Sequence, residues 1–313
     1  MYHIRQFYGL IIGLLILSGC GPGEINGTWT VVKWDATTHL YGVFFADDKN
    51  GWGVGDSGII IHTTDGGMTW NVQKEANSDS SGLLNAVYFP NKTYGWVVGT
   101  EGQILYTDSG GNSWNQQSSN IEEGLLDIFF INNAEGWAVG GYGKILHTSN
   151  GGGSWIQQSS GSNHLWSVYF TDAKNGWVVG EKGEIFHTSD GGSRWESQNS
   201  DVNWALFSVH FVDKMNGWIV GAKGIILHTA DGGSHWQEQK SGTTKSLRGV
   251  FFTNAKNGWC VGEEGMILYT SDGGATWVKQ PNETSEHLLD IYFHGKNGWI
   301  VGAAGTILRL SKF

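Results

Sequence analysis

One short motif recurs at a nearly constant interval along the 313-residue chain, and it limits the possible folds more than any other feature. The motif reads Gly-Trp-x-Val-Gly, and its successive tryptophans lie 44, 41, 40, 41, 41 and 40 residues apart. A fixed period of this length is typical of repeat architectures. Because seven copies occupy almost the whole chain, we expect one repeat domain over residues 27–313. The tryptophans are Trp52, Trp96, Trp137, Trp177, Trp218, Trp259 and Trp299.

Each repeat is predicted to form four short strands, as residues 247–279 illustrate. Leu247–Phe252 (LRGVFF) is an apolar run, and the Trp-x-Val segment after it holds the large and β-branched residues that favour extended chain. A third strand, Met266–Thr270, leads through Ser-Asp-Gly-Gly into a fourth that begins near Trp277. Asp-Gly-Gly is a hairpin signal, because glycine accepts positive φ and the Asp carboxylate accepts hydrogen bonds from turn amides. No long segment has the helical period, so we expect almost no helix.

Four antiparallel strands in every repeat of this length are the pattern of a β-propeller blade. The chain is therefore predicted to be an all-β, seven-bladed β-propeller. Its two ends indicate how the ring closes: the last copy stops near Ser311 without a fourth strand, whereas residues 27–32 (GTWTVV) resemble the strand that is missing. We predict that this N-terminal strand completes the last blade and removes an open sheet edge.

The repeated tryptophans are interpreted as core residues. A large side chain at one fixed strand position buries a large apolar area in every seam between neighbouring blades. This interpretation gives them no role as platforms for a ligand.

A second motif, Ser/Thr-x-Asp-x-Gly-x-x-Trp, precedes the fourth strand. It resembles the Asp-box, or BNR repeat, of sialidase-like propellers. In those proteins the motif is a structural hairpin at the blade periphery, so the resemblance implies no catalytic role. Two copies depart from the pattern, with Asn150 and Ser109 in the acidic position. The complete copies contain Asp65, Asp190, Asp231 and Asp272.

The combination of the Asp-box with seven Gly-Trp-x-Val-Gly copies is similar to the Ycf48/Hcf136 family of photosystem II assembly factors and their relatives. The resemblance covers essentially all of the mature chain. It implies a protein without enzymatic activity that binds assembling membrane proteins. Photosynthetic members share an arginine-rich surface patch, whereas the mature chain here has Arg194, Arg248 and Arg309 in three different copies.

Residues 1–19 have the features of an export signal. Arg5 supplies a positive start, and residues 10–17 (LIIGLLIL) form an apolar core that is too short to span a membrane. The segment ends Leu-Ser-Gly-Cys, which resembles the bacterial lipobox and implies that Cys20 becomes an acylated first residue. Several acyl chains give stable anchoring. We therefore expect a lipoprotein tethered through residues 20–26 to a membrane of the bacterial envelope, with Gly21 favouring the outer membrane in a Gram-negative host; an ordinary cleaved signal is the alternative.

The mature chain is acidic. From residue 20 onward, 18 basic residues face 29 acidic ones, which gives a net charge of −11. This balance disfavours nucleic acid as a partner, because a phosphate backbone would be repelled. With Cys20 acylated, Cys260 has no disulfide partner, and we expect it to be a buried thiol.

The loops that join each fourth strand to the next blade vary most in sequence. They are expected to share one face with the turns between the second and third strands. On a rigid repeat scaffold, specificity usually lies in such loops. We predict that an acidic, aromatic-bearing rim binds a protein partner, a membrane protein or complex; merely solvated loops are the alternative. The predicted rim comprises Trp34, Asp35, Glu75, Glu122, Glu123, Trp204, Glu283 and Glu286.

Two polar sets near the propeller axis leave ion binding open. His39, His164 and His287 share the position before the innermost strand, and we favour loop histidines over a metal site. Asp127 and Asp290 should lie near the central channel. There they either bind a cation or ordered water or, in the favoured interpretation, hydrogen-bond to a backbone amide or indole of the next blade. We predict no catalytic residue, metal site or cofactor.

The sequence thus predicts a monomeric, membrane-anchored binding or assembly platform that is not an enzyme. The alternative is a sialidase-like propeller that binds or hydrolyses glycans. Such enzymes hold the substrate carboxylate with three arginines and use a Tyr/Glu nucleophile pair. Arg194 lies within an Asp-box turn, and Arg309 occupies a position held elsewhere by His or Tyr. We therefore do not expect the three arginines to converge.

Overall fold

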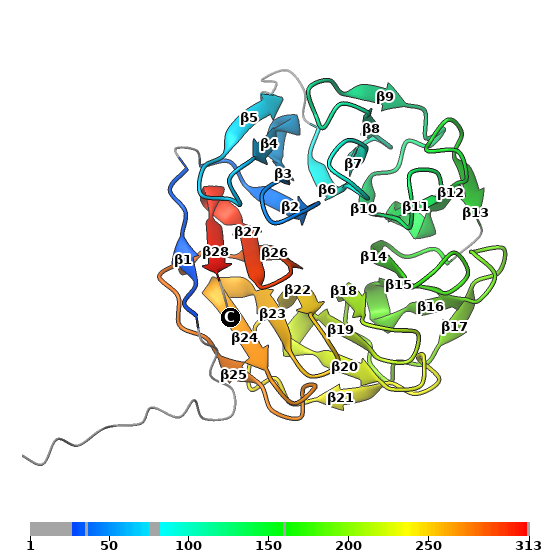
Figure 1. The fold of residues 1–313 in the computed structure, drawn as a ribbon. Helices are drawn as coiled ribbons and strands as arrows, with labels where there is room; N and C mark the ends of the chain where they lie inside the picture. The colour runs from blue at the N-terminus through cyan, green and yellow to red at the C-terminus, as the bar shows by residue number, and fades with distance from the viewer. Residues whose placement is uncertain (1–26, 35–36, 75–81, 159–160, 312–313) are drawn as a thin grey trace, which may run out of the picture.

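The computed structural model describes residues 27–34, 37–74, 82–158 and 161–311. Within these ranges the chain forms 28 β-strands, arranged as seven four-stranded antiparallel sheets. Figure 1 shows the sheets as successive blades of a closed ring, coloured in chain order around a central axis. The predicted all-β, seven-bladed β-propeller is therefore confirmed.

Each blade begins with its innermost strand and ends with its outermost strand. Blades 1 to 3 are β2 (Leu40–Phe45), β3 (Gly51–Gly55), β4 (Ile60–Thr63), β5 (Asn71–Lys74); β6 (Leu84–Tyr88), β7 (Gly95–Gly99), β8 (Ile104–Thr107), β9 (Asn115–Gln117); and β10 (Leu125–Phe130), β11 (Gly136–Gly140), β12 (Ile145–Thr148), β13 (Ile156–Gln158). Blades 4 and 5 are β14 (Leu165–Phe170), β15 (Gly176–Gly180), β16 (Ile185–Thr188), β17 (Glu196–Gln198); and β18 (Leu206–Phe211), β19 (Gly217–Gly221), β20 (Ile226–Thr229), β21 (Gln237–Gln239). Blades 6 and 7 are β22 (Leu247–Phe252), β23 (Gly258–Gly262), β24 (Met266–Thr270), β25 (Val278–Lys279); and β26 (Leu288–His294), β27 (Asn297–Gly302), β28 (Ile307–Ser311), β1 (Thr30–Val31).

Three-residue 3-10 turns connect the second and third strands in six blades. Their central residues have positive φ, for example 54° at Ser57, and a glycine with positive φ follows each. In the described part of the chain, no helix has the length and apolar character needed to cross a membrane. The turns are η1 (Asp56–Gly58), η2 (Gly141–Gly143), η3 (Glu181–Gly183), η4 (Ala222–Gly224), η5 (Glu263–Gly265) and η6 (Ala303–Gly305).

The first strand of the chain closes the ring. β1 pairs antiparallel with β28, with Thr30 opposite Arg309, and the amide of Val32 extends the pairing by donating to the carbonyl of Ile307 at 2.9 Å. The sheet order of blade 7 is accordingly β1-β28-β27-β26. This is the predicted closure. The export signal (1–19), Cys20 and the tether (20–26) lie outside the described residues.

Every seam between blades is built from one tryptophan and one phenylalanine. Each motif tryptophan stacks on the last aromatic residue of the next innermost strand, as Trp52 does on Phe89 with ring centroids 3.6 Å apart. Trp299 of blade 7 stacks on Phe45 of blade 1 at 3.5 Å, so the closing seam uses the same contact. The seven motif tryptophans are at most 1% exposed. Their interpretation as core residues is therefore confirmed.

A glutamine in the outermost strand links five of the seams: Gln73 makes one bond, to the carbonyl of Gly110 at 3.0 Å, and the other four make two bonds each. In blade 3, Gln158 accepts a hydrogen bond from Nε1 of Trp195 at 3.2 Å and donates to the carbonyl of Gly191 at 3.3 Å, both in blade 4. Gln117, Gln198 and Gln239 make the corresponding pair of bonds.

The closing seam replaces that glutamine with an arginine from a different strand. The equivalent position on the N-terminal strand holds Val32, and the buried Nε1 of Trp70 has no hydrogen-bond partner among the described residues. Instead, Nε of Arg309 donates to the carbonyl of Gly66 at 2.7 Å, alongside Nε1 of Trp299 at 2.9 Å. Arg309 therefore has a structural partner at the seam between blades 7 and 1.

The Asp-box turn is held by its acidic side chain and its threonine. Asp65 accepts bonds from the amides of Met68 and Thr69, and Thr63 accepts one from the amide of Gly67. Burial alone would raise the pKa of Asp65, but the bonds it accepts from the hydroxyl and amide of Thr69, the hydroxyl of Thr63 and the amide of Met68 lower it to about 2. Gly67 has a φ of 79°, and a Cβ there would lie 2.6 Å from Nε1 of Trp299. The turn therefore needs glycine both for its backbone and for the close approach of the indole.

Candidate binding face and axial pocket

The variable loops that join the blades and the turns between the second and third strands lie on one face of the ring, which we call the loop face. The amide of Asp56 in η1 donates to the carbonyl of His39 in the loop before blade 1, at 3.0 Å. At the other end of the chain, the amide of Gly265 in η5 donates to the carbonyl of Glu286 at 2.8 Å. These bonds hold the loops against the turns, so side chains from both project from a firmly supported surface.

The predicted rim residues differ in how freely they are presented. Glu122, Glu283 and Glu286 are exposed, whereas Glu123 is half-buried and pairs with Lys144 at 3.3 Å. Trp204 is 45% exposed, and Nζ of Lys223 lies 3.6 Å from the centroid of an indole ring of this residue. Glu122, Glu283 and Glu286 thus remain available on the loop face, which also carries the exposed indole of Trp204.

Three predicted rim residues remain, Trp34, Asp35 and Glu75. Trp34 is partly buried, because it packs against the core cluster that contains Trp70 and Trp299 at the closing seam. Asp35 and Glu75 lie outside the described residues. Of the two predicted rim tryptophans, Trp204 is therefore the more exposed.

The loop histidines hydrogen-bond to neighbouring turns. Nδ1 of His39 accepts a bond from the amide of Ala304 in blade 7 at 2.9 Å, and Nδ1 of His287 accepts one from Glu264 in blade 6 at 3.2 Å. His164 packs against Tyr142, with ring centroids 5.1 Å apart. No group of three or more His, Cys, Asp or Glu side chains within the described ranges could hold a metal ion. These histidines join adjacent blades on the loop face.

The three arginines of the mature chain lie in different environments. Arg194 is exposed beside its Asp-box and pairs with Glu196 at 3.2 Å, and Arg309 is engaged at the closing seam. Arg248 alone lines a cavity on the propeller axis. The arrangement therefore lacks the convergence of arginines expected for a sialidase-like carboxylate site.

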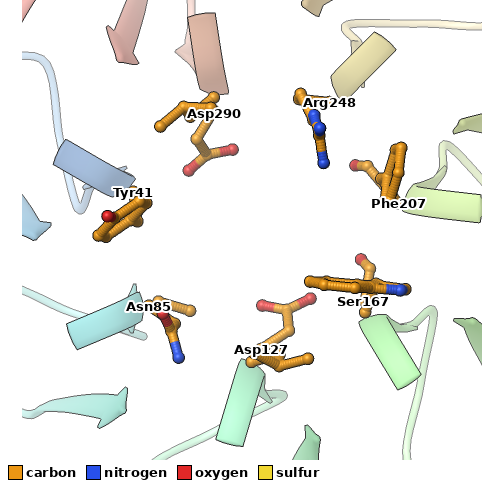
Figure 2. A pocket seen from close by; sticks show the side chains of 12 residues that line it. Tyr41, Asn85, Asp127, Ser167, Phe207, Arg248 and Asp290 are labelled. Carbon is orange, nitrogen blue, oxygen red and sulfur yellow. The ribbon is translucent and has the colours of Figure 1, made fainter. Parts of the chain in front are cut away.

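A cavity of about 220 Å³ opens at the start of the innermost strands, and we call it the axial pocket. Its mouth is formed by the second residue of each innermost strand, and its deeper layer by the third. Figure 2 shows Asp127 and Asp290 reaching toward its centre from opposite sides. The mouth residues are Tyr41, Asn85, Leu126, Trp166, Phe207, Arg248 and Leu289, and the deeper residues are Ala86, Asp127, Ser167, Ser208 and Asp290.

Each of the two carboxylates bridges two blades. Asp127 accepts a bond from the amide of Ile128 at 2.8 Å and one from Val168 in the next blade at 2.9 Å. The interpretation that it hydrogen-bonds to a backbone amide of the next blade is confirmed. Burial raises the pKa of Asp127 to about 6, against the lowering effect of these bonds and of one from Ser167.

Asp290 repeats this geometry across the closing seam. It accepts bonds from the amides of Ile291 at 2.8 Å and Val43 at 2.9 Å. Burial raises the pKa of Asp290 to about 7, and the negative charge of Asp127 raises it further against the effect of the two amides. Each carboxyl group therefore exchanges its proton close to neutral pH.

Arg248 is fixed at the mouth of the axial pocket. One of its guanidinium nitrogens lies 3.3 Å from a carboxylate oxygen of Glu263, and the guanidinium carbon lies 4.2 Å from the centroid of the Phe207 ring. Phe207 in turn contacts Trp166 edge-on, with ring centroids 5.6 Å apart. The positive charge of Arg248 is thus partly compensated by Glu263 and held against an aromatic wall.

A closed circle of aromatic rings lies beneath the carboxylates, and we call it the aromatic floor. It is formed by the fifth residue of each innermost strand, and neighbouring ring centroids are 4.4 to 5.4 Å apart around the full circle. These rings border a second cavity of about 240 Å³ that shares Asp127, Ser167, Ser208 and Asp290 with the axial pocket. The members are Phe44, Tyr88, Phe129, Tyr169, His210, Phe251 and Tyr292.

His210 is the one imidazole among the rings of the floor. It is 8% exposed, and its Nδ1 has no hydrogen-bond partner in the described part of the chain. Burial lowers the pKa of His210 to about 3, so the imidazole is neutral at physiological pH. The floor was not predicted from the sequence, although an aromatic residue or histidine at the fifth position of every innermost strand is a visible signal.

Comparison with known proteins places the chain in a family. The sequence profile described as "Photosynthesis system II assembly factor YCF48" matches residues 22–117, 74–162, 157–243 and 234–312. The Photosystem II assembly lipoprotein Ycf48 of Prochlorococcus marinus (strain NATL2A) is 40% identical over 74 residues, which cover 22% of this chain and 21% of that protein. The match thus spans about a fifth of the length of this curated relative.

Solved structures share the fold. A structure of Ycf48 bound to a D1 peptide has a TM-score of 0.80 at 22% identity and covers 93% of this chain and 99% of its own. Ycf48 from Cyanidioschyzon merolae gives 0.77 at 21% identity, with 91% and 99% covered. Virginiamycin B lyase from Staphylococcus aureus also gives 0.77, at 13% identity, with 91% and 100% covered. Because the sequence profile extends over nearly the whole propeller, the chain belongs to the Ycf48 family of photosystem II assembly factors.

Proposed function

We propose that the chain is a polypeptide-binding assembly platform without enzymatic activity, which binds a membrane protein or complex through its loop face. Cys20 would anchor it, as a monomer, to a membrane of the bacterial envelope. The family supports this proposal, as do a relative described as a lipoprotein and a solved Ycf48 that carries a D1 peptide.

The observation that carries the proposal is the location of the tryptophans that the repeat does not require. Thirteen of the 17 tryptophans belong to the two repeat motifs, and Trp29 takes the equivalent place on the closing strand. The other three are Trp34, Trp166 and Trp204, and all three lie in the loops or pocket mouth of the loop face. Tryptophan is enriched where proteins bind one another and is a frequent energetic centre of such interfaces. Its concentration on one face favours that face as the partner surface.

The arrangement of charged groups favours binding over glycan hydrolysis. A sialidase-like site needs arginines that converge on one carboxylate. Here Arg248 is at the pocket, while Arg194 and Arg309 bond to Glu196 and Gly66 elsewhere. The axial carboxylates, in turn, each accept two backbone amides that join blades.

Crosslinking in the native envelope tests the proposal. The chain, carrying a C-terminal tag, is captured after crosslinking, and its partners are identified by mass spectrometry. We expect one membrane complex to be recovered with the native chain and lost with a Glu122/Glu123/Trp204 triple-alanine variant. The matched control replaces Lys92, Met215 and Lys256, three exposed residues of the opposite face, with alanine. Equal recovery with the loop-face variant, or loss with the control variant alone, would contradict the proposed face.

A further inference from the structure

We propose that the axial pocket binds one organic cation, the ammonium or guanidinium group of a lysine or arginine side chain that a partner polypeptide inserts from the loop face. The identity of the supplier rests on the proposed function. Binding of the cation itself rests on the pocket alone.

The seams between blades do not need charged groups at this position. Ser167 and Ser208 occupy the same register as the two aspartates, and their hydroxyls accept bonds from the next-blade amides of Val209 at 3.4 Å and Val250 at 3.3 Å. In three other blades the position holds glycine or alanine. Burying a carboxylate costs more than burying a hydroxyl. Asp127 and Asp290 therefore carry a charge that the fold itself can do without.

The two carboxylates have capacity for further hydrogen bonds. An ionised carboxylate has about four lone-pair sites. The backbone amides use two on each side chain, and Ser167 contributes to Asp127. Figure 2 shows both carboxylates directed into the pocket. Each retains acceptor capacity toward a donor placed between them.

An independent observation at the floor also indicates a missing donor. His210 is more than nine-tenths buried, it borders the cavity that Asp127 and Asp290 share, and its Nδ1 has no partner within the described residues. A buried polar atom is normally hydrogen-bonded, so an orphan requires an explanation. A neutral imidazole offers one nitrogen lone pair. With the ring proton on Nε2, this lone pair is on Nδ1 and suits the N–H of a cation.

The surroundings favour an organic cation over a metal ion. The described residues provide no set of three His, Cys, Asp or Glu side chains that could coordinate a metal. The rings of the aromatic floor border the adjoining cavity, and ammonium and guanidinium groups are attracted to aromatic rings. Leu126 and Leu289 at the mouth provide an apolar wall for the alkyl stem of a side chain. A space of about 220 Å³ accommodates one such group and excludes a folded element.

The charges near the axial pocket favour one bound cation per protein molecule. Arg248 is partly compensated by Glu263 at 3.3 Å, and the two aspartates are the acids of the lining that have no such partner. Because they repel each other, one monocation between them relieves the repulsion and satisfies both. A second cation would meet the guanidinium of Arg248 at the mouth.

Isothermal titration calorimetry of the full chain with n-butylammonium and n-propylguanidinium tests the pocket. We expect saturable one-to-one binding to the native protein and at least tenfold weaker binding to Asp127→Ser/Asp290→Ser. These replacements copy the blades that carry Ser167 and Ser208, so the seam bonds are retained, and a thermal melt verifies the fold. Glu122→Gln/Glu123→Gln removes two charges outside the pocket and should bind as the native chain does.

Several results would overturn the pocket proposal. These are equal binding to the native chain and the double-serine variant, an absence of binding to the native chain, and displacement of n-butylammonium by equimolar Na⁺ or Ca²⁺. The last would make the site an inorganic-ion site. As a spectroscopic check, the indole ¹⁵N–¹H signal of Trp166 in the native chain should shift on titration. This signal is assigned by its absence from a Trp166→Phe variant.

The role of the partner is tested separately. The double-serine variant should recover less of the crosslinked membrane complex than the native chain, while the Glu122/Glu123/Trp204 triple variant keeps its affinity for n-butylammonium. Equal recovery by the double-serine variant would overturn the partner as the source of the cation. If the native chain recovers no complex but binds n-butylammonium, the proposed assembly platform is contradicted and cation binding by the axial pocket is supported.

Discussion

Oδ2 of Asp290 in the last blade accepts a hydrogen bond of 2.9 Å from the backbone amide of Val43 in the first blade. Asp127 makes the same bond to Val168 halfway around the ring. Two seams are therefore tied by a buried acid where others use a hydroxyl or no side chain. Because the acids lie in a shared cavity, their protonation is coupled to the stability of the ring.

The pH dependence of stability should reveal these two acids. Their pKa values in the folded protein, about 6 and about 7, exceed the unfolded value near 4, so the folded state holds more protons between these limits. The native chain should therefore gain stability relative to Asp127→Ser/Asp290→Ser as pH falls from 8 to 5, by on the order of 3 kcal/mol. Urea unfolding of both proteins at each pH measures the difference. A difference that stays constant, or that shrinks toward acid, would contradict the buried-acid assignment.

His210→Phe should make the protein more resistant to mild acid. The unfolded histidine takes up a proton below about pH 6.5, whereas burial keeps the folded one neutral to about pH 3, so native stability is lost as pH falls through 6.5. At pH 5 the variant should be more stable than the native chain by about 2 kcal/mol, with a smaller difference at pH 8. Phenylalanine already occupies this register at Phe129 and Phe251, so it should fit. Thermal unfolding at the two pH values gives the comparison, and the same gain at both would indicate a packing effect alone.

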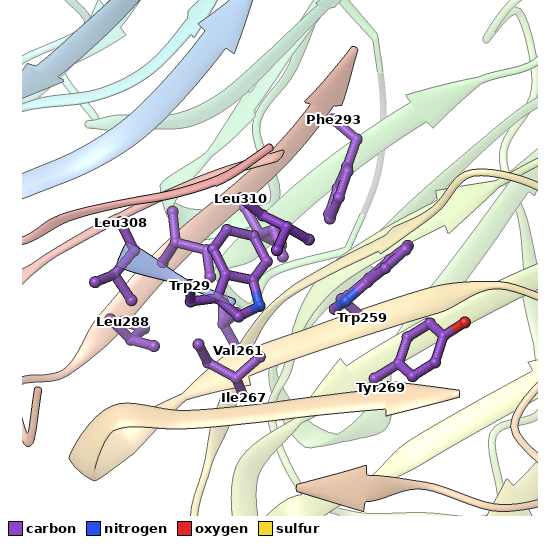
Figure 3. Close-up of a cluster of buried hydrophobic side chains, with 11 residues drawn as sticks. Trp29, Trp259, Val261, Ile267, Tyr269, Leu288, Phe293, Leu308 and Leu310 are labelled. Carbon is purple, nitrogen blue, oxygen red and sulfur yellow. The ribbon is translucent and has the colours of Figure 1, made fainter. Parts of the chain in front are cut away.

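Trp29→Ala should destabilise the whole ring. Trp29 is 1% exposed and joins the cluster of Trp259, Leu308 and Phe293 at the seam between blades 6 and 7 (Figure 3). Truncation of a buried tryptophan typically costs about 3 to 5 kcal/mol, because a cavity remains. Chemical unfolding should show this loss in a single transition, because the strand closes the circle. Trp204→Ala removes an exposed indole and is the control, for which we expect a change below about 0.5 kcal/mol.

The arginine at the closing seam should be replaceable by the glutamine used elsewhere. Arg309→His restores the residue type of other blades but loses the 2.7 Å bond to Gly66, which should cost about 1 to 2 kcal/mol. Adding Val32→Gln should recover most of this loss, because Gln117 and its equivalents bond both a glycine carbonyl and the neighbouring tryptophan. A double-mutant cycle on unfolding free energies gives the coupling. Additive effects of the two changes would argue against a shared role.

The fold was predictable because its information is periodic. The positions of Trp52 and its six equivalents set the blade number, and residues 27–32 set the closure, so neither depended on detailed packing. Which residues form the pocket and the floor depends instead on which side chains of the innermost strand face the channel. A register shift between Leu125 and Asp127, repeated in every blade, sets which residues line the channel. Sequence alternation alone does not reveal such a bulge.

The loop face was predictable in outline but not in the exposure of each side chain. Trp34 follows a strand whose pairing continues through Val32, and this brings its ring back onto the closing seam. Lys223 approaches Trp204 from a turn 19 positions later in the chain. Both contacts depend on how loops fold over neighbouring turns, which a repeat pattern does not encode.

The pairing of the first strand with the last also delays closure of the ring until synthesis of the chain is nearly complete. The hydroxyl of Thr30 donates to the carbonyl of Arg309, a residue 279 positions later. At ribosomal rates of about 5 to 20 residues per second, the first strand waits roughly 15 to 55 seconds for its partner to exist. Throughout that interval the ring is open and Trp29 lacks β28, so an incomplete chain differs from a finished one in a way that chaperones and proteases can recognise.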